Sequence, residues 1–454
     1  MIAKRMEKSV RHRIAIDLVV LLLLTVCDAA GQTQGYGGPA ILSRGAPRIG
    51  RGSGRPIRLR PYISVFGQYI NDMTRPATDD AGNFQSVDTA GILGRLGLMG
   101  SHTTERSNTT VDGILGYNRF TNSSYYSGWN GHLGVSHGRQ LSRRAGFYAA
   151  VAGVTQDTVI PLRLNPVAGE VETSLAQSAS QVFDARFRSG HAIMGFSFQP
   201  TRRWAFDISG GAFATQYHSN TLVSWRGFNA AGEVNYYLTA RQTAGVDYSF
   251  QEYYYTSRFG EGRSQSLMPT WSRRLNPRWD LRLGAGVYRL DYERLQAVRV
   301  DPIIARLTGQ STTLVATSGS VHGLSALARL AGNFTNSAAE FSYRRGTDPG
   351  NGVILSTESQ HFSAGYSYTG VRDWNFGARL WFGRWAEAFN NRNKYAWGSV
   401  GAGASRRIAS FVHFTSQVVF VRSLLTSGKR SSLNRYYLVA GFSFSPGEIP
   451  LSLF

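Results

Sequence analysis

The sequence has one cysteine, few acids and no apolar run long enough to form a helical membrane span. Cys27 is the only cysteine in 454 residues, which excludes a disulfide framework and a cysteine metal site. Only 17% of the residues are charged, and 28 acids against 49 bases give a formal charge of +21. Apolar residues are dispersed along the chain and never form a run of about 20, so a helical membrane protein is excluded.

The longest apolar run, Leu18 to Val26, lies near the N-terminus and precedes Ala29 and Ala30. Five basic residues come before it: Lys4, Arg5, Lys8, Arg11 and Arg13. This order of basic, apolar and small-residue parts is typical of a secretory signal. We predict a signal peptide over residues 1–30, cleaved after Ala29 or Ala30. Lipid attachment at Cys27 is less favoured, because Val26 stands where a lipoprotein signal has Gly or Ala.

Residues 31–60 contain six arginines and no acid, and they show no periodic apolar pattern. Gly and Pro are frequent there, which predicts a flexible basic periplasmic leader before the first strand. A basic balance can also indicate nucleic-acid binding. The secretion signal and the lack of any nucleic-acid module argue against a nucleic-acid partner.

The stretch Arg226 to Gln251 shows the pattern that recurs through the rest of the chain. Phe228, Val234 and Leu238 share one side of an extended segment, and Glu233 lies on the other side. After a polar break at residues 239–242, the alternation resumes with apolar Val246 opposite Asp247. Two strands of about ten residues, each apolar on one face, are what a membrane-spanning β-hairpin requires.

The same alternation continues over residues 61–454. Short basic connections alternate with longer ones, among them Gln156 to Ser178 and Asp291 to Ser318. This asymmetry is typical of a transmembrane antiparallel up-and-down β-barrel, and the connections indicate about 18 strands, with 16 as the alternative. An even number predicts that both termini are periplasmic. A β-propeller is the competing fold, but its repeat uses four short strands where this chain has two long ones.

The signal, the alternation, the aromatic strand ends and the C-terminal Phe454 resemble the bacterial outer-membrane β-barrel class, porin-like in size, over residues 61–454. Pro446 to Pro450 departs from the pattern, because it separates the last clear strand from Phe454. The resemblance implies an outer-membrane location, contact with outer-membrane lipids and insertion by the barrel-assembly machinery. Whether the chain forms a homo-oligomer stays open.

Catalytic, cofactor and metal sites are not predicted. The glycines at 91, 94, 97 and 100 lie inside a strand pattern and not in a phosphate-binding loop, and the nine histidines show no metal-ligand spacing. Ser, His and acidic residues are too dispersed to assign a nucleophile and its base. An enzyme acting on lipid is therefore the least favoured function.

Charged residues on the polar side of the strands are the candidate lumen-lining residues. They are Arg95, Asp112, Asp207, Glu233, Asp247, Asp280, Arg282, Arg329, Glu340, Arg344, Arg379 and Arg435. Most of the acids come from the first half of the wall and most of the arginines from the second half. Either they pair locally across neighbouring strands, or they create a transverse field across a water-filled channel.

The sequence predicts a porin-like outer-membrane channel for passive diffusion of small polar solutes, with no cofactor. The alternative is an outer-membrane component that exports a polysaccharide or another polymer, which the basic leader and basic turns would receive. The loop Gln156 to Ser178 contains the apolar run Val159 to Leu162. We predict that this loop covers or enters the mouth of the barrel.

Overall fold

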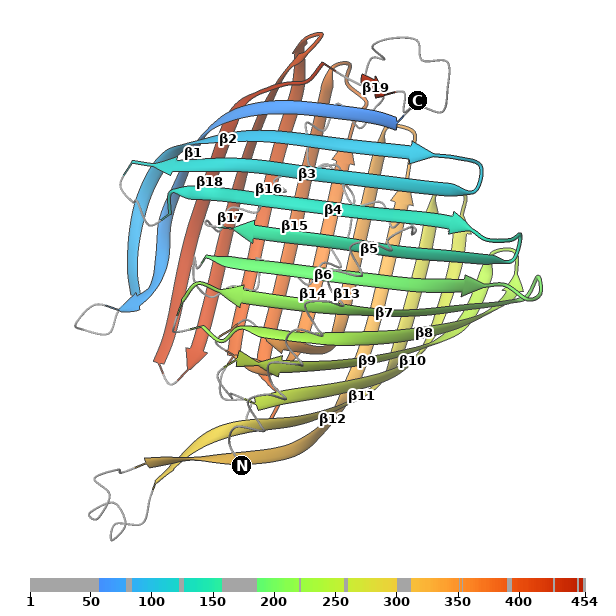
Figure 1. Ribbon diagram of the computed structural model, residues 1–454. Coiled ribbons are helices and arrows are strands. Elements are labelled where there is room, and N and C mark those ends of the chain that lie inside the picture. Colours follow the sequence, from blue (N-terminus) through green and yellow to red (C-terminus); the bar gives the residue numbers. More distant parts are fainter. Residues whose placement is uncertain are drawn as a thin grey trace, which may run out of the picture.

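A computed structural model describes residues 57–78, 84–121, 126–156, 186–219, 222–256, 260–299, 312–350, 352, 354–389, 394–427, 429–446 and 449–451. In these residues every long element is a strand, and each strand pairs antiparallel with its neighbours. Figure 1 shows the strands of the front and back walls crossing, which is the tilt that a closed barrel requires.

The elements follow one another around the wall in chain order. They are β1 (Ile57–Thr78), β2 (Phe84–Thr103), β3 (Ser107–Phe120), β4 (Gly128–Gln140), β5 (Ala145–Gln156), β6 (Phe187–Phe198), β7 (Trp204–Tyr217), β8 (Trp225–Thr239), β9 (Gln242–Tyr255), β10 (Gly260–Asn276), β11 (Trp279–Arg299), β12 (Thr312–Asn333), β13 (Ser337–Gly350), β14 (Leu355–Tyr368), β15 (Trp374–Glu387), β16 (Lys394–Ala409), β17 (Val412–Ser427), β18 (Lys429–Phe444) and β19 (Ile449–Leu451).

The first and last long strands close the barrel. Residues Ile63 to Ile70 of β1 pair with Phe444 to Tyr437 of β18, while the other edge of β1 pairs with β2. The short β19 continues the wall by pairing with Ile57 to Leu59 of β1. Eighteen long strands therefore form a closed antiparallel barrel, and the predicted fold class and strand number are confirmed.

Burial alternates along the strands as the sequence predicts. In β1, Ile63 and Val65 are each 55% exposed. The residues that alternate with them, Tyr62 and Ser64, are only 3% and 2% exposed. Successive side chains of a strand point to opposite faces, so the exposed apolar residues cover the outside and the buried ones face the interior.

The two ends of the barrel differ in their connections. Strands at one end are joined by short turns, such as those between β4 and β5, β8 and β9, or β16 and β17, and we name this end the short-turn rim. At the other end, the long-loop rim, the longest connections follow β5 and β11. The first residues of β1 and the last of β18 lie at the short-turn rim, because they pair with each other there.

Strand β1 begins at Ile57, four residues before the expected start of the barrel at residue 61. Ile57 to Arg60 therefore belong to the wall and not to the leader. The signal peptide, the remainder of the leader, Phe454 and the greater part of the loop Gln156 to Ser178 lie outside the described residues. The predictions about them stay predictions.

The wall is uneven at β12 and β13. Strand β12 pairs with β11 over its full length from Thr312 to Gly332, but it pairs with β13 only from Ala326 to Asn333. Beyond Arg345, β13 pairs with β14 alone. The end of the β13–β14 hairpin is thus free to leave the wall.

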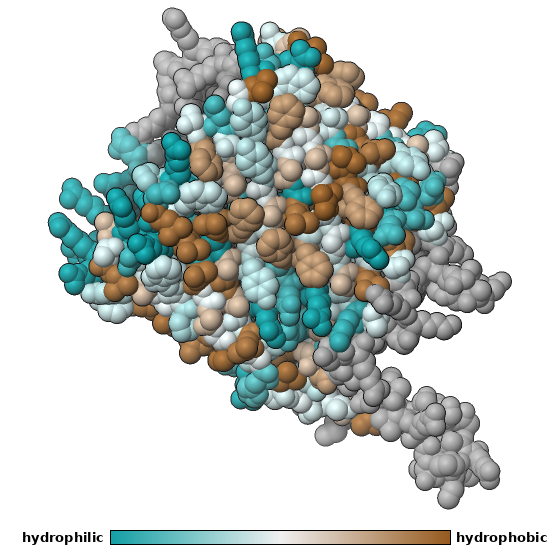
Figure 2. Space-filling model, turned by 180° about the vertical axis from the view of Figure 1, so that it is seen from behind, coloured by the Kyte–Doolittle hydropathy of each residue, from teal (hydrophilic) through white to brown (hydrophobic). Residues whose placement is uncertain are grey.

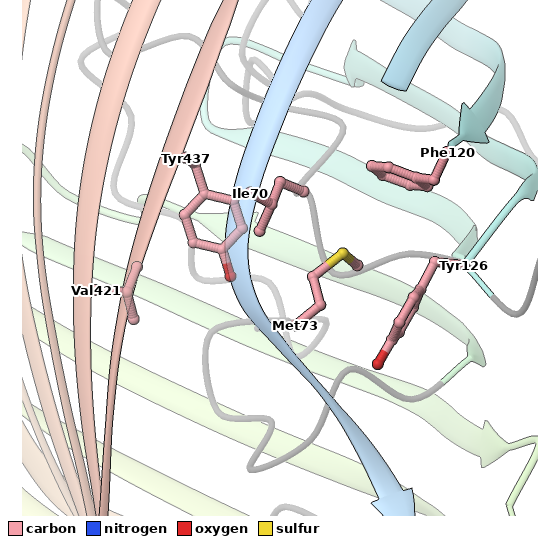
Figure 3. Packing of buried hydrophobic residues seen from close by; sticks show 6 residues of the cluster. All are labelled: Ile70, Met73, Phe120, Tyr126, Val421 and Tyr437. Carbon is pink, nitrogen blue, oxygen red and sulfur yellow. The ribbon is translucent and has the colours of Figure 1, made fainter. Parts of the chain in front are cut away.

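Apolar side chains fill part of the interior near the long-loop rim. Ile70 and Met73 of β1 pack with Phe120 and Tyr126 on one side and with Val421 and Tyr437 on the other. Figure 3 shows these six side chains pointing toward one another from β1, β3, β17 and β18 and from the connection after β3.

No helix in the described part of the chain is long and apolar enough to cross a membrane.

Candidate functional site

One ion-pair cluster lies on the inner face of β8 to β11. Glu233 of β8 and Asp247 of β9 are direct cross-strand partners. The Arg282 guanidinium of β11 reaches across β10 and lies 3.1 Å from Glu233 Oε1 and 2.9 Å from Asp247 Oδ2. The side chains of Arg282, Glu233 and Asp247 are 35%, 31% and 23% exposed, so this cluster faces open space inside the barrel.

Other predicted acids also have a partner on a neighbouring strand. Arg329 Nε of β12 lies 2.6 Å from Glu340 Oε1 of β13. Asp112 Oδ2 of β3 lies 2.6 Å from His132 Nε2 of β4.

Asp280 pairs with Arg274 at 3.2 Å, but both side chains are more than half exposed and lie beside the short turn from β10 to β11. Asp280 therefore belongs to the short-turn rim and not to the inner wall.

The remaining predicted residues are distributed around the interior. Asp207 accepts a hydrogen bond of 2.9 Å from the Tyr148 hydroxyl. Arg95 is 8% exposed, with its guanidinium carbon 5.4 Å from the centre of the Phe66 ring, and Arg435 is 5% exposed. Arg344 is exposed and Arg379 is half-buried.

Local pairing accounts for five of these charges. Arg282 lies against Glu233 and Asp247, and Arg329 lies against Glu340, so acids and arginines neutralise one another on neighbouring strands. A transverse field across the whole bore would need these groups to face one another from opposite walls. The contacts therefore favour local pairing across neighbouring strands over a transverse field.

The inner wall differs from one sector to another. On β1, β3, β4 and β17 some inward polar residues are almost fully buried, with Ser64 at 2% and Asn118, Asn130 and His413 at 1%. On β8 to β12 the charged residues described above are partly exposed, and inward Ser249 of β9 is exposed as well. Open space inside the barrel therefore adjoins β8 to β12.

The end of the β13–β14 hairpin folds inward and lies against this sector. The Tyr255 hydroxyl of β9 donates to the Pro349 carbonyl and accepts a 2.6 Å hydrogen bond from the Ser356 amide. The Val223 amide, in the connection before β8, donates to the Gly352 carbonyl at 2.9 Å. The hairpin end thus crosses from its own strands to the inner face of β8 and β9.

Two further contacts hold the base of the infolded segment. The Tyr288 hydroxyl of β11 donates to Glu358 Oε2 at 3.1 Å, and Glu358 also pairs with Arg345 at 2.8 Å. The hydroxyls of Ser264 on β10 and Thr347 hydrogen-bond to each other. Polar contacts therefore run along the hairpin from β9 to β11.

Apolar packing holds the tip from both sides. Leu355 packs against a cluster that includes Trp225, Tyr253 and Tyr288 of the β8 to β11 wall. Ile354, 3% exposed, packs with Trp385 and Tyr395 of β15 and β16. Adjacent residues of the hairpin thus contact two separate parts of the inner wall and bridge the space between them.

The backbone at the tip requires residues that accept positive φ. Gly350 and Gly352 have φ values of 104° and 83°, and Ser356 has a φ of 50°. A Cβ atom at Gly352 would lie 2.8 Å from the Tyr217 ring, so a larger residue would push the tip away from β7.

We name Pro349 to Ser356, without Asn351 and Val353, which are not described, the inner hairpin tip. This segment was not predicted from the sequence, and the loop predicted to restrict the mouth was a different one. Its only local signals are glycines at positions 346, 350 and 352 and a proline at 349, which also fit an ordinary exposed turn.

The outer face decides the class of the protein. Large apolar residues are exposed on every side of the wall, for example Ile92 at 62%, Ile208 at 66% and Leu324 at 60%. Figure 2 shows apolar and weakly polar residues across the middle of one face and hydrophilic ones toward its margins. The chain is an outer-membrane-type β-barrel. An apolar exterior around a closed sheet with a polar interior suits a bilayer and not water.

No protein-family model matches the sequence, and no curated protein does. Among solved structures, the barrel is similar to the ferric yersiniabactin uptake receptor FyuA from Yersinia pestis, with 12% identity, a TM-score of 0.37 and 82% of this chain covered. The match spans 63% of the FyuA chain.

Two Pseudomonas aeruginosa structures are also similar. OpdO has 13% identity and a TM-score of 0.40 over 86% of this chain and 97% of its own. The outer membrane protein OpdK has 13% identity and a TM-score of 0.39 over 85% and 99%. Likeness at this level carries no argument about function, so the proposals below depend on the residues of this chain.

Proposed function

We propose that this barrel is a channel of the outer membrane through which small polar solutes diffuse passively. The observation that carries the proposal is the partly exposed ion-pair cluster of Arg282, Glu233 and Asp247 on the inner face of β8 to β11. Charged groups in open space inside a barrel are solvated by water, and a water-filled path admits polar solutes in preference to apolar ones.

The solute path that we infer follows the open sector and passes the inner hairpin tip. The tip contacts the same strands, β8 and β9, at their long-loop ends, and it bridges to β15 and β16. A large barrel needs such a constriction to be selective. Selectivity then comes from bore width at the tip and from the partly neutralised charges below it.

Liposome swelling tests this function. Liposomes that contain the protein are placed in isosmotic solutions of uncharged sugars of increasing size, and the swelling rate is followed by light scattering. We expect small sugars to enter quickly and the rate to fall steeply with solute size. Swelling no faster than in protein-free liposomes for every sugar would contradict the proposal.

The location that accompanies this function places both termini in the periplasm and the long-loop rim at the cell surface. The asymmetry of the two rims supports it, because outer-membrane barrels have short periplasmic turns and longer extracellular loops. A protease added to intact cells should therefore cleave within the connections at the long-loop rim and leave the short-turn rim uncut.

One feature favours export of an acidic polymer as a second candidate. The short-turn rim carries exposed arginines in its turns, among them Arg143, Arg202 and Arg241. A polyanion added on that side of a planar bilayer should block the current at micromolar concentration if the rim receives a polymer. Absence of block from either side would remove this candidate.

A further inference from the structure

Seven arginines on the outer face of the barrel lie near the long-loop ends of their strands. We name them the arginine belt: Arg119 of β3, Arg188 of β6, Arg226 of β8, Arg263 of β10, Arg289 of β11, Arg384 of β15 and Arg422 of β17. Six of them are exposed and Arg384 is half-buried. The sequence reading assigned arginines to the short-turn rim and to the lumen, and it did not find this group.

Strand alternation places the belt on the side that faces lipid. Arg119 lies two residues beyond Tyr117, which is 41% exposed, and Arg226 lies two residues before Phe228, which is 43% exposed. Residues two apart in a strand share a face. Arg422 has the same relation to the outward face of β17, where Val418 is 44% exposed.

The pairing registers give the belt a common height. Because barrel strands tilt, residues at one height are not direct cross-strand partners. Their positions shift along the strand, relative to the pairing register, from each strand to the next. Arg188 pairs with Gln216, and Arg226 pairs with Ala214, two residues nearer the short-turn rim on β7. Arg226 in turn pairs with Tyr254.

The same step continues around the wall. Arg263 pairs with Glu252, two residues from Tyr254 along β9, and Arg289 pairs with Gln265, two residues from Arg263 along β10. On the far side Arg384 pairs with Ala396, whose other partner is Leu424, and Arg422 lies two residues from Leu424. The belt therefore runs around the barrel at one level.

Five members of the belt have no protein partner among the described residues. Arg263 pairs with Glu252 at 3.3 Å and Arg289 pairs with Asp291 at 3.0 Å. For Arg119, Arg188, Arg226, Arg384 and Arg422, no acid or hydrogen-bond partner occurs among the described residues. No group in the described part of the chain neutralises these guanidinium groups at the margin of the apolar surface, where a charge needs a counter-ion.

The opposite margin of the apolar surface is built differently. There the outward residues include aromatic rings, such as Trp204, Phe376 and Phe444, together with the exposed strand residues Arg139, Arg273 and Arg406, and further arginines lie in the turns. Aromatic rings suit the interface between lipid tails and water, but they do not neutralise an anion. The short-turn margin thus combines aromatic rings with arginines, whereas the belt at the long-loop margin is a row of arginines at one level.

We propose that the arginine belt binds the phosphate groups of lipid headgroups in the leaflet around the long-loop rim. A guanidinium group forms paired hydrogen bonds with phosphate oxygens, which an ammonium group cannot do. Neighbouring strands are about 4.8 Å apart, so Arg188 and Arg226, two strands apart, stand about 10 Å from each other. That spacing suits two phosphates of one headgroup or of two adjacent lipids.

Native mass spectrometry of the detergent-solubilised full-length protein tests the belt. The probes are diphosphorylated lipid A, a dephosphorylated lipid A with the same acyl chains, and inorganic phosphate. The variant is Arg119→Gln/Arg188→Gln/Arg226→Gln. The matched control is Arg143→Gln/Arg202→Gln/Arg241→Gln, which removes three exposed arginines from the short-turn rim.

We expect wild type and control to retain the diphosphorylated lipid, and the belt variant to bind it about tenfold more weakly or worse. The dephosphorylated lipid should bind all three proteins equally weakly. Equal retention of the phosphorylated lipid by the belt variant would overturn the proposal.

Two other outcomes would also overturn it. Inorganic phosphate that binds as tightly as the lipid would show an ion site with no lipid specificity. A belt variant that changes from an oligomer to a monomer while still retaining the lipid would show that the belt is a contact between copies of this chain. Unfolding temperatures of the three proteins establish that each variant is folded.

Discussion

Tyr255 is the single residue that joins the inner hairpin tip to the wall most directly. Its hydroxyl hydrogen-bonds to the Pro349 carbonyl and the Ser356 amide, and it lies 3.2 Å from the Ser356 hydroxyl. Tyr253 adds a 3.4 Å contact with the same serine hydroxyl. Removal of the Tyr255 hydroxyl would leave two buried backbone groups without a partner.

We therefore expect Tyr255→Phe to loosen the tip. Each of the two lost hydrogen bonds weakens docking of the tip by about 0.5–1.5 kcal/mol. The population of molecules with an undocked tip should therefore rise by about tenfold or more. Single-channel records should show more frequent openings to a larger conductance. Tyr248→Phe, on the outward face of the same strand, is the matched control. Records that do not differ between the two variants would contradict the role of Tyr255 in holding the inner hairpin tip.

Arg282 should set the charge balance of the open sector. Arg282→Gln would leave Glu233 and Asp247 without their cation, so the ratio of cation to anion permeability should rise. The reversal potential in a potassium chloride gradient measures this ratio. Arg289→Gln, outward on the same strand, should leave it unchanged. A shift toward anions in Arg282→Gln would contradict the assignment.

For single residues, the sequence predicted which face of the wall a side chain lies on, but not which side chains it contacts. Strand parity was enough to list Glu233, Asp247 and Arg282 as inward residues, because side chains alternate along a strand. It could not show that Arg282 reaches over β10 to β8 and β9, since that contact depends on pairing register and on the length of the side chain. The position of Asp280 beside the short turn could not be predicted either, since its height in the wall was unknown.

Individual strands and hairpins were predicted well where the pattern is regular. The hairpin of β8 and β9 occupies Trp225–Thr239 and Gln242–Tyr255, close to the predicted Arg226 to Gln251. The inward fold of β13–β14 was missed, because it results from contacts with Tyr255, Tyr288 and Trp385, which are distant in sequence. No local periodicity carries that information.

Depth in the membrane should grade the effect of a charge on the outer face. Leu283 lies between Arg289 in the belt and Trp279 at the short-turn margin, so Leu283→Arg should cost about 2–4 kcal/mol of unfolding free energy. Phe228, next to belt residue Arg226, lies near the interface, and Phe228→Arg should cost about 0–1 kcal/mol. Urea unfolding in lipid vesicles measures both values.

Inward Ser249→Arg is the control for that series, because it adds the same side chain to exposed space inside the barrel. We expect its unfolding free energy to stay near that of wild type. Equal costs for Leu283→Arg and Phe228→Arg would contradict the height assigned to the arginine belt. A larger cost for Ser249→Arg than for Leu283→Arg would reverse the assignment of the two faces.

The net charge of +21 on the whole chain does not predict the charge selectivity of the proposed channel. Many arginines lie in the turns of the short-turn rim, and the belt arginines face lipid, while inward Arg282 and Arg329 pair with acids on neighbouring strands. Charges farther than the Debye length of about 8 Å at physiological salt act weakly on a passing ion. We expect weak selectivity between simple anions and cations, and any anion preference should fade as salt rises.

A reversal-potential series from low to high potassium chloride concentration measures that dependence. Strong anion selectivity that persists at high salt would mean that arginines line the narrowest part of the path. The sequence predicted the class, the strand number and the polar interior of this molecule. The inward position of the inner hairpin tip could not be predicted, because it depends on a hairpin that leaves the wall after Arg345.

Planar-bilayer conductance of wild type and of a shortened hairpin tests the central claim most directly. Asp348 and Thr357 are cross-strand partners, so an Asn-Gly turn in place of residues 349–356 can join them without disturbing the strands below. We predict stepwise conductance for wild type and distinctly larger steps for the shortened protein, with both proportional to the conductivity of the bath. The same conductance from both proteins, or none from either, would contradict a water-filled channel that the inner hairpin tip constricts.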